Sequence, residues 1–140
     1  MANALTTQLI LDGPRNCVVK IVGILDTSDV APVVIVNPAT LTGMDFTGLI
    51  KAAGLLLTKI TYKVEDGLEV RLAWEATTPV FIEDITGRGV QDYVAFGGLP
   101  NNSGAGRTGS IMLSTEGWAS LSVKSFTLVL EMVKEGKPHV

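Results

Sequence analysis

The chain has 140 residues, the usual size of one domain, so we expect a single hydrophobic core over residues 1–140. It is 46% hydrophobic and only 18% charged, with a net charge of −3, whereas about 25% charged residues is typical. No run of Lys and Arg is present to neutralise phosphates, and no stretch reaches about 18 consecutive apolar residues. The composition therefore argues against nucleic-acid partners and membrane spans. The start of the chain lacks the pattern of a signal peptide, which predicts a soluble protein made in a cytoplasm.

The apolar surplus has two interpretations. In the first, the chain is a well-buried β domain that holds the surplus in its own core. In the second, other subunits of an assembly cover some of the surplus. Cys17 is the only cysteine and cannot form an internal disulfide. Its place inside an apolar stretch favours a buried structural thiol over a redox or nucleophilic group.

Two apolar runs open the chain, at residues 9–11 and 17–25, and the Asp, Gly, Pro and Asn between them predict a turn. The second run is rich in β-branched Val and Ile, which is typical of a strand. Its nearly continuous apolar character predicts a strand covered on both faces. Residues 1–8 precede this region and are expected to form a flexible arm that becomes ordered on assembly.

Further strands are predicted along the middle of the chain. The run PVVIVN at 32–37 indicates a short strand, whereas 48–57 is a weak helix candidate that fits a further strand equally well. Apolar and polar residues alternate through 59–74 on both sides of an Asp-Gly pair, which predicts a β-hairpin. In that hairpin, lysines of one strand would lie opposite charged residues of the other.

The last third also indicates strands, at residues 109–115 and 122–135, on either side of a Glu-Gly-Trp turn. Residues 136–140 are expected to be a flexible tail. Short strands at intervals of about ten residues, separated by Gly and Pro, predict an all-β fold. We expect a single antiparallel domain, built as a β-sandwich, a jelly-roll-like sandwich or a barrel, with at most one short helix.

Residues 104–109 read GAGRTG, which has the spacing of a dinucleotide-binding fingerprint. That fingerprint needs a strand before the glycines and a helix after them. Here a loop precedes them and a strand follows, so no cofactor is expected. Residues 97–110 are interpreted as a long glycine-rich loop, either a plain surface loop or a contact with a neighbouring subunit. The candidate interface residues are Gly98, Asn101, Asn102, Gly104, Gly106, Arg107 and Trp118.

No arrangement of residues in the sequence indicates catalysis. His139 is the only histidine and lies one residue from the end of the sequence, so no catalytic triad, Cys–His pair or zinc cluster can be assembled around it. The carboxylates of Glu83 and Asp84 follow an apolar stretch and fit a solvated strand edge better than an acid–base pair. We therefore expect no enzymatic activity, no catalytic residue and no metal site.

Three stretches carry a resemblance to small virion structural proteins of tailed bacteriophages. They read LILDGPRNCVVKIVGILDTSD, EDGLEVRLAWEATTPV and GRGVQDYVAFGGLPNNSGAGRTGSIMLSTEGW. The resemblance implies a β-rich accessory protein of the capsid surface, a decoration or cement protein. It would bind the lattice of the major capsid protein as a homo-oligomer, with a trimer favoured. No catalytic residues are carried over.

Two other functions remain open at this stage. One is a structural role in the tail, in the connector or at the base of a head fibre. The other is a carbohydrate-binding module, in which Trp118 would act with polar groups such as Asn101, Asn102 and Asp92. Loss of glycan binding on replacing Trp118 would favour the module.

Overall fold

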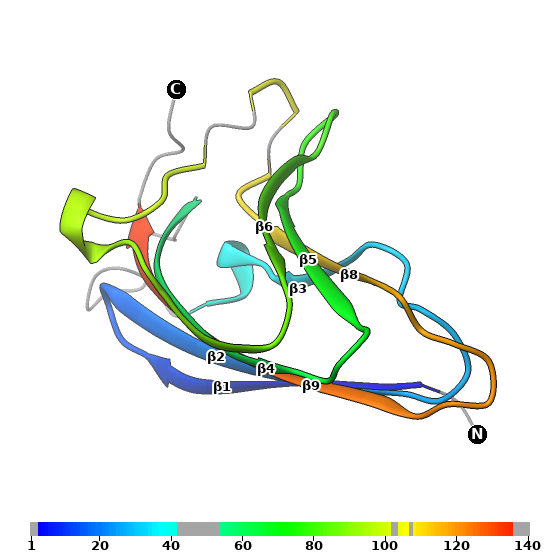
Figure 1. Ribbon diagram of the computed structural model, residues 1–140. Helices are drawn as coiled ribbons and strands as arrows, with labels where there is room; N and C mark the ends of the chain where they lie inside the picture. The colour runs from blue at the N-terminus through cyan, green and yellow to red at the C-terminus, as the bar shows by residue number, and fades with distance from the viewer. Residues whose placement is uncertain (1–2, 42–53, 102–103, 107, 136–140) are drawn as a thin grey trace.

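The computed structural model describes residues 3–41, 54–101, 104–106 and 108–135, and most of them form two antiparallel sheets (Figure 1). The strands are β1 (Ala4–Asp12), β2 (Asn16–Leu25), β3 (Val33–Val36), β4 (Gly54–Val64), β5 (Glu69–Trp74), β6 (Val80–Ile85), β7 (Arg88–Asp92), β8 (Ile111–Glu116) and β9 (Lys124–Glu135). Two short 3-10 turns, η1 (Pro38–Thr40) and η2 (Val94–Phe96), complete the described elements. The all-β prediction is confirmed.

The strands pair in a nested order. One sheet runs β1-β2-β9-β4-β7 and the other β3-β8-β5-β6. Strand β2 lies beside β9, β3 beside β8, β4 beside β7 and β5 beside β6, so the chain from β2 to β9 is one long ribbon rolled up on itself. This is the strand order of a jelly roll, with β1 added at one edge. Both sheets are open at their edges, so the fold is a sandwich and not a closed barrel.

The prediction that residues 59–74 form a β-hairpin is wrong. The two strands and the turn between them exist, but β4 lies in the five-stranded sheet and β5 in the four-stranded sheet. Strands β4 and β5 are consecutive in the chain but do not pair with each other, because the chain crosses from one sheet to the other between them. Their apolar sides face each other through the core, so the expected pairs of opposite charges across the turn do not form. The hairpin at the tip of the ribbon is β5–β6.

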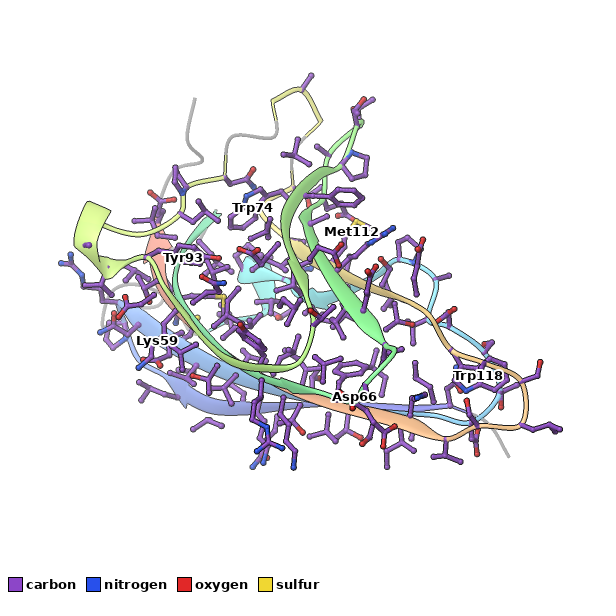
Figure 2. All side chains as sticks on the ribbon, in the orientation of Figure 1. Lys59, Asp66, Trp74, Tyr93, Met112 and Trp118 are labelled. Atoms are coloured by element: carbon purple, nitrogen blue, oxygen red, sulfur yellow. The ribbon has the colours of Figure 1, made fainter. Side chains whose placement is uncertain are left out.

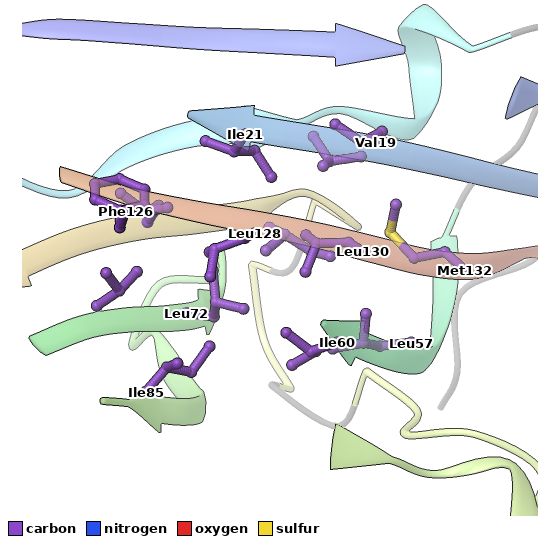
Figure 3. Close-up of a cluster of buried hydrophobic side chains, with 14 of the residues drawn as sticks. Val19, Ile21, Leu57, Ile60, Leu72, Ile85, Phe126, Leu128, Leu130 and Met132 are labelled. Carbon is purple, nitrogen blue, oxygen red and sulfur yellow. The ribbon is translucent and has the colours of Figure 1, made fainter. Parts of the chain in front are cut away.

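The core fills the space between the two sheets (Figure 3). Strands β2 and β9 alternate buried with half-exposed residues, so each presents one side to the core. The expectation that 17–25 is covered on both faces is therefore wrong, and its outer side is only partly shielded. Large fully buried side chains come from both sheets, as in a sandwich. They include Ile21, Leu57, Ile60, Leu72, Trp74, Phe126 and Leu128.

The N-terminal segment is a strand rather than a flexible arm. Residues 4–8 belong to β1 and pair with β2. The preceding Asn3 also anchors the start of β1, because its side-chain oxygen accepts hydrogen bonds from the backbone N–H groups of Asp26 and Thr27 at 2.9 and 3.0 Å. The sequence did not indicate this strand because residues 4–8 are mostly polar and exposed. The predicted tail at 136–140 lies outside the described residues.

The remaining predicted segments are found at nearly the expected places. Strand β3 lies within 32–37, β8 overlaps 109–115, and β9 covers most of 122–135. Residues 54–57 of the weak helix candidate belong to β4, and its other residues lie outside the described part of the chain.

Candidate functional site: the outer face of the four-stranded sheet

The glycine-rich loop is tied to the rest of the fold by backbone hydrogen bonds. Thr77, in the loop between β5 and β6, donates its backbone N–H to the carbonyl of Ala105 at 3.2 Å. Thr108 donates its backbone N–H to Glu75 at 3.2 Å and its hydroxyl to the Glu75 carboxylate at 2.7 Å. The described part of this loop therefore docks on the tip of the β5–β6 hairpin.

The described candidate residues of this loop differ in their surroundings. Gly98 is buried, and Asn101 is only 3% exposed. Gly106 has φ +76°, and a Cβ atom there would lie 2.0 Å from the hydroxyl of Thr77, so this close approach requires glycine. Gly104 is exposed, with no atom near a Cβ position. Asn102 and Arg107 lie outside the described residues, and the interface role of the loop stays a prediction.

Trp118 is part of the fold's own packing. Its indole N–H donates to the carbonyls of Leu25 and Ser122, both at 3.1 Å, and its backbone N–H donates to the Asp29 carboxylate. The ring packs against the core at the end of the molecule where β8 finishes (Figure 2). Because the glycine-rich loop lies at the other end of β8, Trp118 and that loop do not form one site.

A continuous row of apolar side chains crosses the outer face of the four-stranded sheet. Val34 of β3 pairs with Met112 of β8, Met112 pairs with Ala73 of β5, and Ala73 pairs with Phe81 of β6. Paired residues of an antiparallel sheet point to the same side. The neighbouring residue Trp74 points into the core, so this row faces outward, and Figure 2 shows Met112 and Trp74 on opposite sides of the sheet. Phe81 lies in the edge strand β6 and is 69% exposed, so the row ends on a large aromatic ring that is open to solvent.

Charged side chains form the next two rows of the same face. Glu69 and Glu116 lie directly opposite each other, an arrangement that repulsion alone would disfavour. Arg71 neutralises it, with guanidinium nitrogens 3.4 Å from Glu69, 2.8 Å from Glu116 and 3.8 Å from Asp84. The same guanidinium lies 5.8 Å from the centre of the Phe81 ring, in cation–π contact. Three carboxylates around one guanidinium leave this part of the face acidic.

The face is hollowed beside Arg71 and Phe81. An open groove of about 610 Å³ lies there, with the β2–β3 connection, including Pro32, as one wall. Ser114 and Glu116 of β8 also line the groove. We call this surface, made of Val34, Ala73, Met112, Phe81, Arg71, Asp84, Glu69 and Glu116, the Phe81 face. It combines an apolar strip with an acidic, hydrogen-bonding border.

Glu83 and Asp84, considered above as paired carboxylates, point to opposite sides of β6. Asp84 lies near Arg71 on the Phe81 face. Glu83 accepts a hydrogen bond from the hydroxyl of Tyr93 at 2.8 Å. Burial, with that hydrogen bond and the charge of Glu83 added, raises the pKa of Tyr93 well above its ordinary value. The two carboxylates therefore have different partners, although both line a small pocket of about 180 Å³ beside Tyr62 and Gln91.

Cys17 is completely buried, which confirms the prediction for this residue. Burial raises the pKa of its thiol from 9.0 to about 11, with Lys134 lowering it and Asp12 raising it by smaller amounts. The native thiol should therefore react with a disulfide reagent at pH 8 at least about 100-fold more slowly than the unfolded chain, because both access and thiolate are lacking. Absorbance during labelling with and without denaturant measures this ratio; equal rates would contradict the burial.

The same shift predicts a pH dependence of stability. Between the unfolded pKa of 9.0 and the native pKa of about 11, the native state binds more protons than the unfolded state. The contribution of Cys17 to stability is therefore complete below pH 9 and is lost as the pH rises through 11. A Cys17→Ala variant should lose less stability over this pH range than the wild type in urea titrations.

The described residues contain no group of three or more His, Cys, Asp and Glu side chains placed to hold a metal ion. Within the same part of the chain, no helix has the length and apolar character to span a membrane. Comparison of the chain with family models, with curated proteins and with solved structures finds no match. The site is therefore interpreted from its own geometry.

Sequence reasoning missed the Phe81 face because the face depends on strand register. Alternation in EVRLAW places Glu69 and Arg71 on the side opposite Leu72, and Phe81 stands between the apolar residues Val80 and Ile82, so local pattern does not mark it as exposed. Such local patterns show which side of a single strand is polar and say nothing about the strand beside it. Only the pairing of four strands brings Val34, Met112 and Phe81 into one row.

Proposed function

We propose that the chain is a non-enzymatic structural protein of a virion, a decoration or cement protein that binds and stabilises the assembled head of a tailed phage. The observation that carries this proposal is the Phe81 face, an apolar row across four strands that ends on an exposed aromatic ring. Only Val34 and Phe81, at the two ends of the row, are plainly exposed, with Met112 half-buried and Ala73 buried between them. Exposed apolar patches are typical of protein contact sites, and aromatic anchors dominate binding energies. The fold suits the role, since jelly rolls are common in capsid and lectin domains, although such an argument is an analogy.

The border of the face indicates the chemistry of the partner surface. Glu69, Asp84 and Glu116 outnumber Arg71, so a complementary surface on the major capsid protein would place Lys or Arg around an apolar patch. A protein that binds the assembled lattice and not its separated subunits stabilises the lattice by mass action. Many copies on a symmetric shell would multiply that effect.

Phe81→Ser should weaken binding to purified heads of the encoding phage by about 30-fold, because the variant loses the largest exposed apolar side chain of the face. Co-sedimentation of the protein with heads over a range of concentrations measures the affinity. Val94→Ser is the matched control, since Val94 is also an exposed apolar residue, at 61%, but lies in η2 away from the face. Unchanged binding of Phe81→Ser would refute the assigned surface, and failure of the wild type to bind heads would refute the function.

Carbohydrate binding is the second candidate, and one observation favours it. The groove beside Phe81 combines an aromatic ring with Arg71, Ser114 and Glu116, the groups with which proteins commonly hold sugars. The sequence alone points to Trp118 and Asn101 as sugar-binding groups. The indole N–H of Trp118, however, donates hydrogen bonds within the fold, and Asn101 is buried. Binding to a glycan array that disappears in Phe81→Ser would support this candidate, and a silent array would favour the virion role. Labelled particles in electron micrographs would separate a head from a tail, connector or fibre-base position.

A further inference from the structure

Strand β1 is an unusual sheet edge. It is nine residues long and, among the described residues, pairs only with β2, so no described strand occupies its other edge. Three consecutive apolar side chains, Leu9, Ile10 and Leu11, are 49%, 53% and 50% exposed. Long exposed edges of this kind are templates for pairing with another chain.

The three other edge strands carry features that prevent such pairing. Strand β3 has only four residues and lies between Pro32 and Pro38. Strand β6 follows Pro79 and carries two carboxylates, and β7 has five residues with a charge at each end. In contrast, β1 has no charged residue before Asp12 and no proline. Its one protective feature is a bulge between Leu9 and Leu11, which leaves the preceding residues regularly paired.

The regular part of β1 is self-complementary. Leu5, Thr7 and Leu9 lie opposite Gly23, Ile21 and Val19 of β2 and share their inner side of the sheet. Thr6 and Gln8 lie on the outer side. If two β1 strands run antiparallel about Thr7, Leu5 of each lies opposite Leu9 of the other, and Thr6 lies opposite Gln8. Apolar residues then meet apolar residues on the inner side, polar meet polar on the outer side, and no like charges are opposed.

We propose that the free edge of β1 pairs antiparallel with β1 of a second copy of this chain, on a two-fold axis through Thr7. The five-stranded sheets of the two copies then continue as one sheet, and the exposed Leu9 of each copy is covered by Leu5 of the other. Such an isologous contact gives a dimer, not the trimer that the resemblance to phage proteins implies. The contact goes beyond the proposed function and does not depend on it. Its strip is narrow compared with a standard interface of about 800 Å² per partner, so we expect micromolar affinity.

Charge placed at the symmetry axis tests this contact. In Thr7→Lys, two ammonium groups lie opposite each other, and in Thr7→Glu two carboxylates do, so each variant alone should dimerise at least about tenfold more weakly than the wild type. A one-to-one mixture of the two variants should restore the dimer, because opposite charges then face each other. Thr7→Val, which keeps a β-branched side chain, should leave the dimer intact.

Sedimentation velocity over protein concentrations of about 10 to 300 μM measures the mass of each sample. Val90→Lys, on the opposite edge of the same sheet, is the control and should leave dimerisation unchanged. Near-ultraviolet circular dichroism checks that each variant keeps the native fold. Four results would overturn the proposal: a wild type that stays monomeric over this range, an oligomer of another size, a dimer that survives Thr7→Lys, and a mixture of Thr7→Lys and Thr7→Glu that stays monomeric.

Discussion

Replacing Asp12 with alanine is expected to lower the free energy of unfolding by about 3 to 5 kcal/mol, the cost of removing one partner from a buried ion pair. The Lys134 side chain is 0% exposed and pairs with the Asp12 carboxylate, and its ammonium group also donates to the Gly13 carbonyl at 2.6 Å. These contacts join β9 to the turn between β1 and β2. Without Asp12, a buried ammonium group would lose the carboxylate that it contacts directly.

Urea titrations followed by tryptophan fluorescence measure this effect. Asp66→Ala is the control, because Asp66 is exposed and its removal should change stability by no more than about 0.5 kcal/mol. The double variant Asp12→Ala/Lys134→Met should be more stable than Asp12→Ala alone, since an apolar side chain replaces a buried charge that has lost the Asp12 carboxylate. A double variant as unstable as the single one would show that the charge is not the cause.

Gly117→Ala is expected to destabilise the fold by about 3 kcal/mol, from backbone strain of about 1 to 2 kcal/mol and a steric clash that adds to it. Gly117 has φ +95°, in the left-handed region, and a Cβ atom there would lie 2.1 Å from the carbonyl oxygen of Gly67. The two glycines hold the crossing between β4 and β5 against the connection that follows β8. An alanine would force these two backbone segments apart.

Gly104→Ala separates the two causes. Gly104 has a similar φ of +82°, but no described atom lies within 4 Å of its Cβ position. Backbone strain is therefore the only expected cause of destabilisation in this variant. Thermal and urea unfolding of both variants should therefore rank Gly117→Ala as the less stable by at least about 1 kcal/mol. Equal losses of stability in the two variants would mean that the close approach of Gly117 to Gly67 adds no steric cost.

The sequence predicted most strands but not their partners. Alternation through 59–74 marked both β4 and β5, yet it also suggested that they pair, because a short Asp-Gly turn usually joins neighbouring strands of one sheet. Periodicity records which side of a strand is apolar and does not record whether the next strand lies beside it or across the core. In a jelly roll the second arrangement is common, since successive strands cross from one sheet to the other.

Burial was predicted better than contact surfaces. Cys17 lies where its apolar neighbours indicated, whereas β2 has one buried side and not the two that were expected. Trp118 was singled out as a possible anchor because it follows a turn glycine, but its indole donates to Leu25, which lies 93 residues away in the sequence, as well as to the nearby Ser122. The Phe81 face required the register of four strands, which no local pattern carries.

Oxidative footprinting of Phe81 and Met112 tests most directly that the Phe81 face is the lattice-binding surface. The two residues lie in one row of the outer face, and mass spectrometry quantifies the oxidation of each side chain in free protein and in protein bound to heads. We expect both to be oxidised several-fold more slowly on the heads, while Val94, which is 61% exposed and away from the face, keeps its rate. Equal oxidation of Phe81 and Met112 in the free and bound protein would contradict the proposal.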